Sequence, residues 1–215
     1  MNKKISLNSF FDKVYVITCN SFFDRQSYIK DHFYKNNIEF DFFVSINNKL
    51  LTPDIISNTN MSLALSHLYC VIDAKLNGYK SILICEDDVN FVENVQLDFQ
   101  NFINVLPDNW NFIQLGNQFW AEKWLKRKYI SENLYEFKWG TGSHCVGINS
   151  NMFSTVIDAF QLFDDPIDFM YYKLFEKYKC YCPESFLADS LSKTDHLNHY
   201  DTKHIFNSTI VHKNI

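Results

Sequence analysis

Residues that interrupt regular structure are scarce in this sequence. Its 215 residues include only five glycines and four prolines. Such a composition excludes a collagen-like chain and a glycine- and proline-rich disordered chain. Hydrophobic residues make up 47% of the sequence, and Phe and Tyr are abundant. We therefore expect a globular protein with a sizeable core, most simply one domain spanning residues 1–215.

Long apolar runs and a basic stripe are also missing. No segment approaches the roughly 20 apolar residues of a membrane-spanning helix, and the first residues lack the apolar core of a secretory signal. The net charge is -5, with acids and bases interspersed, which argues against a nucleic-acid partner. We expect a soluble, cytoplasmic protein without a transmembrane segment, for which peripheral contact with a membrane stays open.

Cysteine pairs with the spacing of a zinc site are absent as well. The six cysteines lie mostly inside apolar runs, and none forms a C-x-x-C motif that faces a second pair. We expect reduced, buried thiols that act as small hydrophobic side chains.

Strand-like and helix-like segments alternate along most of the chain. β-branched and aromatic residues predict strands at 13–19, 38–46, 79–85, 110–116, 133–139 and 143–148. Apolar residues at helical spacing predict helices at 24–37, 60–78, 92–106, 149–163 and 164–178. This alternation predicts an α/β fold, a mostly parallel sheet flanked by helices.

Two helix starts and one loop follow from local residue types. Asp24 is the expected N-cap of the first long helix, and Asp165 that of the last, with Pro166 at its first helical position. Segment 117–142 contains a glycine-flanked turn and is expected to be mobile. The ending at 179–215 opens with a short predicted strand and then becomes polar, with no further element that the sequence assigns.

Three consecutive acids, Glu86, Asp87 and Asp88, follow the apolar run at 82–85. Alternation along an extended chain predicts Glu86 and Asp88 on one side and Asp87 on the other. Ligands of open α/β sheets bind outside the carboxyl ends of the strands. Two carboxylates held together there favour a divalent cation with oxygen ligands, Mn²⁺ or Mg²⁺. The residues alone also allow a simpler role, in which the acids solvate the strand end or cap the next helix.

Other motifs accompany the acids in a fixed order. They are Tyr15-Val16-Ile17 with Asp24-Arg25, LALSHL at 63–68, ILICEDDV at 82–89, LPDNWNFIQLG at 106–116, GTGSHCVGINSNM at 140–152 and Pro166-Ile167-Asp168. This series resembles glycosyltransferase family 25, the group that contains lipooligosaccharide and collagen galactosyltransferases. The resemblance covers residues 13 to about 192 and leaves a polar extension at 193–215.

The resemblance implies a single GT-A type, Rossmann-like domain and a nucleotide-sugar-dependent hexosyltransferase. Such an enzyme moves galactose or glucose from a UDP-sugar, with inversion, to a glycan or to a hydroxylated, hydroxylysine-like peptide acceptor. The family's role in lipooligosaccharide assembly makes lipopolysaccharide biosynthesis the expected setting.

The same resemblance suggests roles for single residues. Asp168 is the expected general base, which takes the proton of the acceptor hydroxyl. The metal would be held by Asp88, Glu86 and His196. Donor contacts are expected from Thr18, Arg25, Ser66, His67 and Asp87.

Each of these residues also has a simpler interpretation. Asp168 suits the first turn of a helix, and Arg25 could be an exposed charge at a helix start, where a cation is slightly unfavourable. His67 suits a half-buried histidine on an apolar helix face, and a histidine in the polar tail, such as His196, most simply faces solvent.

Two other functions remain open from the sequence. A metal-dependent phosphohydrolase also places acids at strand ends, although EDDVN lacks the nucleophilic pattern of a haloacid-dehalogenase type enzyme. A non-catalytic sugar-binding module would explain the aromatic content.

Overall fold

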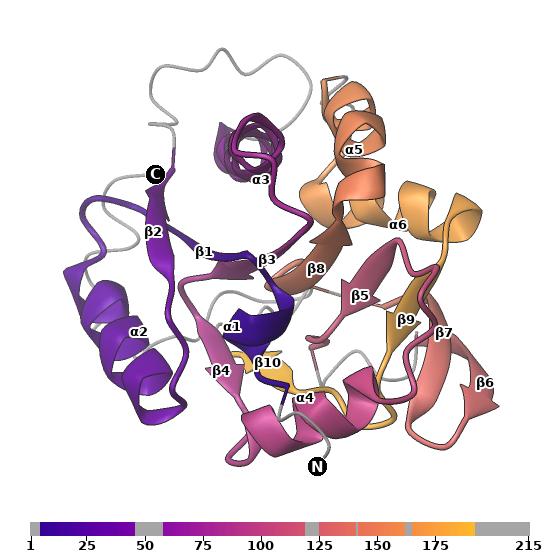
Figure 1. The fold of residues 1–215 in the computed structure, drawn as a ribbon. Helices are drawn as coiled ribbons and strands as arrows, with labels where there is room; N and C mark the ends of the chain where they lie inside the picture. Colours follow the sequence, from indigo (N-terminus) through magenta and orange to yellow (C-terminus); the bar gives the residue numbers. More distant parts are fainter. Residues whose placement is uncertain (1–4, 46–57, 119–124, 141, 162–164, 192–215) are drawn as a thin grey trace.

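The computed structural model describes residues 5–45, 58–118, 125–140, 142–161 and 165–191 (Figure 1). Its helical elements are α1 (Leu7–Phe10), α2 (Phe23–Lys35), α3 (Asn58–Leu76), α4 (Val95–Ile103), η3 (Ser150–Met152), α5 (Phe153–Phe160) and α6 (Ile167–Lys177). Its strands are β1 (Lys13–Thr18), β2 (Asp41–Val44), β3 (Ser81–Glu86), β4 (Val89–Phe91), β5 (Phe112–Gln114), β6 (Lys126–Ser131), β7 (Leu134–Trp139), β8 (Cys145–Asn149), β9 (Cys180–Cys182) and β10 (Ala188–Ser190).

In the described part of the chain, eight strands form one sheet in the order β2-β1-β3-β8-β5-β9-β7-β6. β1 pairs in parallel with both β2 and β3, and β5 pairs in parallel with β9. The pairings of β8 and β7 are antiparallel, so these two strands run against the other six. The predicted fold class, a mostly parallel sheet flanked by helices, is confirmed.

Each face of the sheet carries its own hydrophobic core. Along β1, Tyr15 and Ile17 belong to the core under α3, α5 and α6, whereas Val14 and Val16 belong to the core under α1, α2 and α4 (Figure 1). This division follows from the alternation of side chains along a strand. Since both faces are covered, the central strands are apolar runs, and polar side chains of β1 and β3 gather at their ends.

The acids lie where β3 leaves the sheet. Glu86 is the last residue of β3, Asp87 and Asp88 form a turn, and β4 follows at once. β4 pairs with β10 in a separate two-stranded sheet. The alternation argument therefore does not apply beyond Glu86, because the chain is no longer extended at the next two residues.

Both predicted N-caps are wrong. The N-cap of α2 is Phe22, and Asp24 lies in the first turn, where the helix dipole favours an acid without a capping bond. The N-cap of α6 is Pro166, whose extended backbone precedes the helix. Asp165 lies one residue earlier and pairs with Lys173.

Much of segment 117–142 is regular structure, contrary to the expected mobile loop. β6 and β7 form an antiparallel hairpin at one edge of the sheet. Asn133 takes a positive φ of 57° at the turn, a conformation that asparagine tolerates better than most residues.

The cysteines are free, as predicted, and five of the six are buried. None of the helices in the described ranges combines the length and apolarity that a membrane crossing requires.

Candidate active site

Three strand ends bring the polar residues together. β1 and β3 are parallel neighbours, so Thr18 and Glu86 end on the same edge of the sheet. β8 is antiparallel to β3, with Cys145 opposite Cys85, so the residues that precede β8 lie at that edge too. The antiparallel register thus places Ser143 and His144 beside the acids.

Asp87 forms a buried cluster with two residues predicted for donor binding. Arg25 Nη1 donates to Asp87 Oδ1 at 2.7 Å, and Thr18 Oγ1 donates to Asp87 Oδ2 at 2.6 Å. Burial is the largest influence on the pKa of Arg25 and lowers it, but the charges of the three acids and the hydrogen bond to Asp87 together raise it, so the net shift is upward. Burial raises the pKa of Asp87, and Arg25 offsets part of that shift. Because both carboxylate oxygens have protein partners, Asp87 anchors α2 and β1 to the acid motif.

Asp88 is held from the opposite side, by the β4–β10 pair. Ser190 Oγ donates to Asp88 Oδ2 at 2.9 Å, and the Leu191 N–H donates to the Asp88 carbonyl at 2.9 Å. Asp88 is only 5% exposed, yet its Oδ1 atom has no hydrogen-bond partner. A buried carboxylate oxygen without a partner is costly unless a ligand or cation completes it.

Glu86 experiences the charge of two other acids. Burial, followed by the charges of Asp88 and Asp168, raises the pKa of Glu86 to about 8. Ser143 Oγ donates a 2.7 Å hydrogen bond to Glu86 Oε1, and this bond offsets only part of the rise in the pKa of Glu86. Three carboxyl groups thus share one site, and a bound cation would relieve their repulsion.

Asp168 joins this site from α6. It lies in the first turn of the helix, as predicted, and its Oδ2 accepts a hydrogen bond from the Gly142 N–H at 3.3 Å. Its charge acts on the pKa values of both Glu86 and His67. Asp168 is half-buried.

The two residues of the Ser-His pair on α3 have different surroundings. Ser66 is bonded within its own helix, whereas His67 lies next to Glu86. Ser66 is fully buried and its hydroxyl donates to the Ser62 carbonyl of the same helix at 2.7 Å. This bond gives Ser66 a structural role within α3. His67 Nδ1 shares a 3.0 Å hydrogen bond with the Tyr171 hydroxyl, and Nε2 lies 3.9 Å from Glu86 Oε1. Burial lowers the pKa of His67 to about 3, so its imidazole is neutral at pH 7.

His144 is a site residue that the sequence did not single out. It is 2% exposed, and neither ring nitrogen has a hydrogen-bond partner. The carbonyl oxygen of His144 accepts a hydrogen bond from the Glu86 N–H at 3.1 Å. The ring fits against two glycines, because a Cβ atom at Gly116 or Gly142 would lie 2.4 Å from a ring nitrogen. His144 lies within the motif GTGSHCVGINSNM, but the motif alone assigned it no role, because its place at the site depends on the antiparallel pairing of β8.

Buried polar atoms without partners concentrate around this site. They include His67 Nε2, Asp88 Oδ1, both His144 ring nitrogens, Gln114 Oε1 and Tyr172 Oη. Gln114 is tied to the site through its Nε2 bond to the Gly142 carbonyl at 2.8 Å, and the pKa of Tyr172 responds to the charge of Asp168. Folded proteins rarely leave so many such atoms in one place unless a ligand or water binds there.

Glu86 and Asp88 are the members of the predicted metal set that the structure describes. Among the residues that the structure describes, no group of three or more His, Cys, Asp or Glu side chains is arranged to hold a metal ion. Glu86 and Asp88 still offer an unpartnered oxygen and mutual repulsion, which suit a cation bound by two carboxylates and by substrate phosphates. His196 lies outside the described residues.

Comparisons with known proteins identify the family of the chain. Residues 11–143 match the family model of glycosyltransferase family 25, described as LPS biosynthesis protein. Since the match spans more than half of the chain, the protein is by class a transferase of the glycosyl type. It belongs to glycosyltransferase family 25. The matched range includes the acid motif, Arg25 and His67, whereas Asp168 lies beyond it. No curated protein sequence matches the chain.

Solved structures resemble the fold at low identity. A197 from STIV has 15% identity and a TM-score of 0.50, and the alignment covers 79% of each chain. A glycosyltransferase involved in the glycosylation of the major capsid of PBCV-1 has 9% identity and a TM-score of 0.49, with 79% of this chain and 80% of that chain covered. At these identities the likeness concerns the fold alone.

Proposed function

We propose that this protein transfers galactose or glucose from a UDP-sugar to a hydroxyl group of a saccharide or hydroxylated acceptor, with inversion at the anomeric carbon. The observation that carries the proposal is the convergence of Glu86, Asp88 and Asp168 among unpartnered buried polar atoms at the end of β3, in a chain of glycosyltransferase family 25. The family's description as LPS biosynthesis protein makes a lipooligosaccharide the first choice of acceptor.

Asp88 and Glu86 are the residues that would hold Mn²⁺ or Mg²⁺. The cation would supply positive charge next to the leaving diphosphate. Ser190 fixes the Asp88 carboxylate and Ser143 fixes that of Glu86, so both acids are oriented before substrate binds.

Asp168 is the proposed general base. Its carboxylate takes the proton of the acceptor hydroxyl, whose oxygen then bonds to the anomeric carbon while the bond from that carbon to the diphosphate breaks. The Gly142 N–H holds one oxygen of the carboxylate and leaves the other for the substrate. Half-burial of the side chain agrees with contact to an acceptor that arrives from solvent.

The remaining predicted residues and His144 form the part of the site proposed to bind the UDP-sugar. Thr18 and Arg25 hold Asp87 and thereby set the shape of the turn that presents Asp88. The unpartnered nitrogens of His67 and His144 are the proposed hydrogen-bonding partners of the UDP-sugar. Ser66 reaches the donor only if its bond to the Ser62 carbonyl is given up.

The test is UDP release from UDP-galactose and UDP-glucose, with and without MnCl₂. We expect turnover of one of the two donors that requires Mn²⁺ and is lost in Asp88→Asn. Asp108→Asn, which changes an exposed acid in a turn, is the matched control and should retain activity. Full activity in Asp88→Asn would remove the proposed metal role, and phosphate release from simple phosphate esters would favour a phosphohydrolase.

A further inference from the structure

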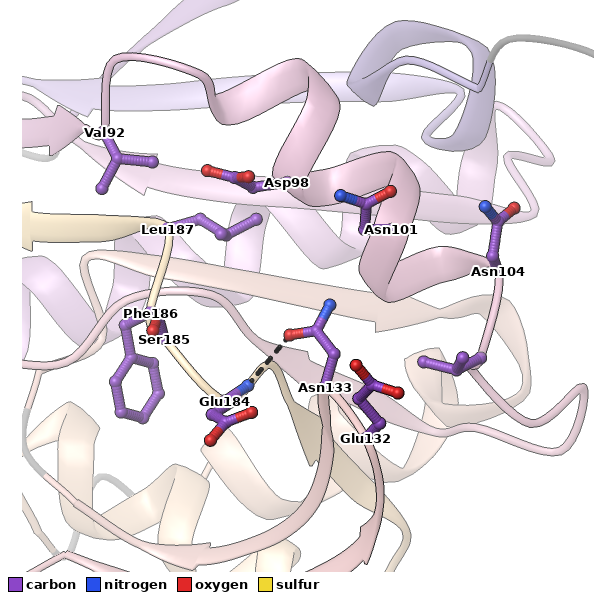
Figure 2. A pocket seen from close by; sticks show the side chains of 11 residues that line it. Val92, Asp98, Asn101, Asn104, Glu132, Asn133, Glu184, Ser185, Phe186 and Leu187 are labelled. Carbon is purple, nitrogen blue, oxygen red and sulfur yellow. Dashed lines mark hydrogen bonds between the residues drawn. The ribbon is translucent and has the colours of Figure 1, made fainter.

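A polar groove is lined by none of the residues of the acid motif. It has a volume of about 560 Å³ and runs between α4, the β6–β7 turn and the loop before β10 (Figure 2). α4 contributes Asp98 and Asn101, and its C-cap residue Asn104 follows three residues further along the same face. The facing wall carries Glu132, Asn133, Glu184 and Ser185, and the apolar part consists of Val92, Val105, Phe186 and Leu187.

The walls of the groove are fixed before any ligand binds. Arg127 of β6 donates from Nη1 to the carbonyls of Pro183 and Glu184, at 3.2 and 2.5 Å. Its guanidinium group lies 5.6 Å from the ring centre of Phe186. Asn133 Oδ1 accepts a hydrogen bond from the Glu184 N–H at 3.3 Å (Figure 2). On the other wall, α4 is anchored by its buried face, which carries Val95, Phe99 and Phe102.

The residues that line the groove favour an uncharged ligand that both donates and accepts hydrogen bonds. It contains carboxylates, carboxamides and one hydroxyl but no Lys, Arg or His, so a phosphate or carboxylate ligand would be repelled. Carboxamide groups both donate and accept hydrogen bonds, and each carboxylate accepts hydrogen bonds with two oxygens. Neighbouring hydroxyl groups of a sugar ring also donate and accept, so they match this mixture. The volume falls within the range of small-molecule sites, roughly 300–1,000 Å³.

One stretch of chain connects this groove with the acid motif. Glu184 to Leu187 line the groove, and three residues further on Ser190 donates to Asp88. The Leu187 carbonyl also accepts from the Val92 N–H at 3.0 Å, which ties both groove residues to the β4–β10 pair. A ligand in the groove therefore contacts the same segment that holds Asp88.

We propose that this groove binds a neutral saccharide portion of the acceptor, remote from the hydroxyl that receives the sugar. The inference rests on the proposed transferase function, because it is that function which makes a glycan the expected acceptor. Binding of a remote part of the substrate lets an enzyme use that interaction to position the reacting group.

The test is an NMR titration of the ¹⁵N-labelled protein with three neutral disaccharides (lactose, maltose and cellobiose) and, separately, with tetralysine. We expect at least one disaccharide to shift the side-chain amide signals of Asn101, Asn104 and Asn133. Asn101→Ala and Glu132→Ala should each weaken that binding about fivefold, as expected for one lost hydrogen bond. Glu93→Ala, which removes an exposed acid outside the lining, should leave it unchanged.

Two results would overturn the proposal. Tetralysine binding in the groove without disaccharide binding would identify a site for a cationic peptide, and no shift with any probe would show that the groove is not a saccharide site. Hydrolysis of the UDP-sugar, measured without acceptor on the same samples, is expected to be equal in wild type and groove variants. Saccharide binding without any such hydrolysis would count against the transferase function and not against the groove.

Discussion

Ser190 Oγ donates a 2.9 Å hydrogen bond to Asp88 Oδ2, and this bond links β10 to the acid motif across a large separation in the chain. The other carboxylate oxygen of Asp88 is buried and unpartnered. One oxygen is thus fixed by the protein while the other is left for a ligand. Outer partners of this kind commonly determine how well a carboxylate binds a metal.

Removal of this hydrogen bond should weaken metal-dependent donor binding without unfolding the protein. We expect Ser190→Ala to lower the apparent Mn²⁺ affinity, measured by UDP-sugar turnover against MnCl₂ concentration, about 10- to 100-fold. Ser27→Ala, on the exposed side of α2, is the control. An unchanged Mn²⁺ dependence in Ser190→Ala would show that the bond does not orient Asp88 for a cation.

The Arg25–Asp87 pair should contribute strongly to stability. Arg25→Gln leaves Asp87 buried with Thr18 as its remaining close partner, and loss of one member of a buried pair costs about 3–5 kcal/mol. The double variant Arg25→Gln, Asp87→Asn should recover part of that loss, because no uncompensated charge remains. Urea denaturation of the two single variants and the double variant measures the coupling, and additive effects would contradict it.

His144→Phe should separate stability from binding. Phenylalanine removes two buried nitrogens that have no partner in the protein, so the free energy of unfolding should stay within about 1 kcal/mol of wild type or rise. If the nitrogens bind the donor, UDP-sugar affinity should fall about tenfold or more, which isothermal titration calorimetry measures. A variant that is destabilised and binds normally would assign His144 to the core alone.

Asp168→Asn should abolish transfer and spare binding. Asparagine keeps an oxygen for the Gly142 N–H but cannot take the acceptor proton. General-base catalysis contributes about 100- to 10,000-fold, so kcat for transfer should fall by that factor while the Kd for the UDP-sugar stays within about twofold. Retained transfer in this variant would exclude Asp168 as the base.

His32 should make stability depend on pH in a region away from the active site. Its Nε2 accepts a 2.8 Å hydrogen bond from the Phe91 N–H, which requires the neutral ring. Burial, and to a lesser extent the charge of Lys35, lowers the pKa of His32 below 6.5. The unfolded chain therefore takes up the proton first, and stability is lost as pH falls from about 6.5 through the lower pKa of the folded state.

The variant His32→Gln keeps an acceptor for the Phe91 N–H but does not titrate. Chemical denaturation at a series of pH values between 5 and 8 should give a smaller loss of stability toward acid in the variant than in wild type. Equal slopes in the two proteins would contradict the role of His32. The other histidines are common to both, so the difference isolates this one.

Much of the fold could be predicted from the sequence because burial leaves a periodic pattern. β1 and β3 are apolar runs, and the acids at the end of β3 stand out for that reason. The strand predicted at 133–139 is β7, but its hairpin partner β6 escaped prediction because β6 is an edge strand with mostly exposed side chains and shows no alternation. Asp165 was a plausible cap, yet an ion pair with Lys173 takes its carboxylate instead.

From residue patterns alone the site was predictable only where residues are local in sequence, and the distant candidates, such as Arg25 and Asp168, were named through the family resemblance. Glu86, Asp87 and Asp88 are adjacent, but their partners Ser143 and Ser190 come from distant segments. The positions of Ser143 and Ser190 depend on the register of β8 against β3 and of β10 against β4. Periodicity shows which face of a strand is buried, and it does not show which strand is its neighbour.

Ligand-induced stabilisation tests most directly whether the acid motif binds a nucleotide sugar with a cation. The melting temperature of wild type and Asp88→Asn is measured with UDP-galactose or UDP-glucose, in MnCl₂ and in EDTA. A ligand at about 100 times its Kd adds about 2.7 kcal/mol to the folded state, so wild type should melt several degrees higher with one UDP-sugar and Mn²⁺ together. Asp88→Asn should show no such rise. An equal rise in Asp88→Asn, or none in wild type with either donor, would contradict the proposed site.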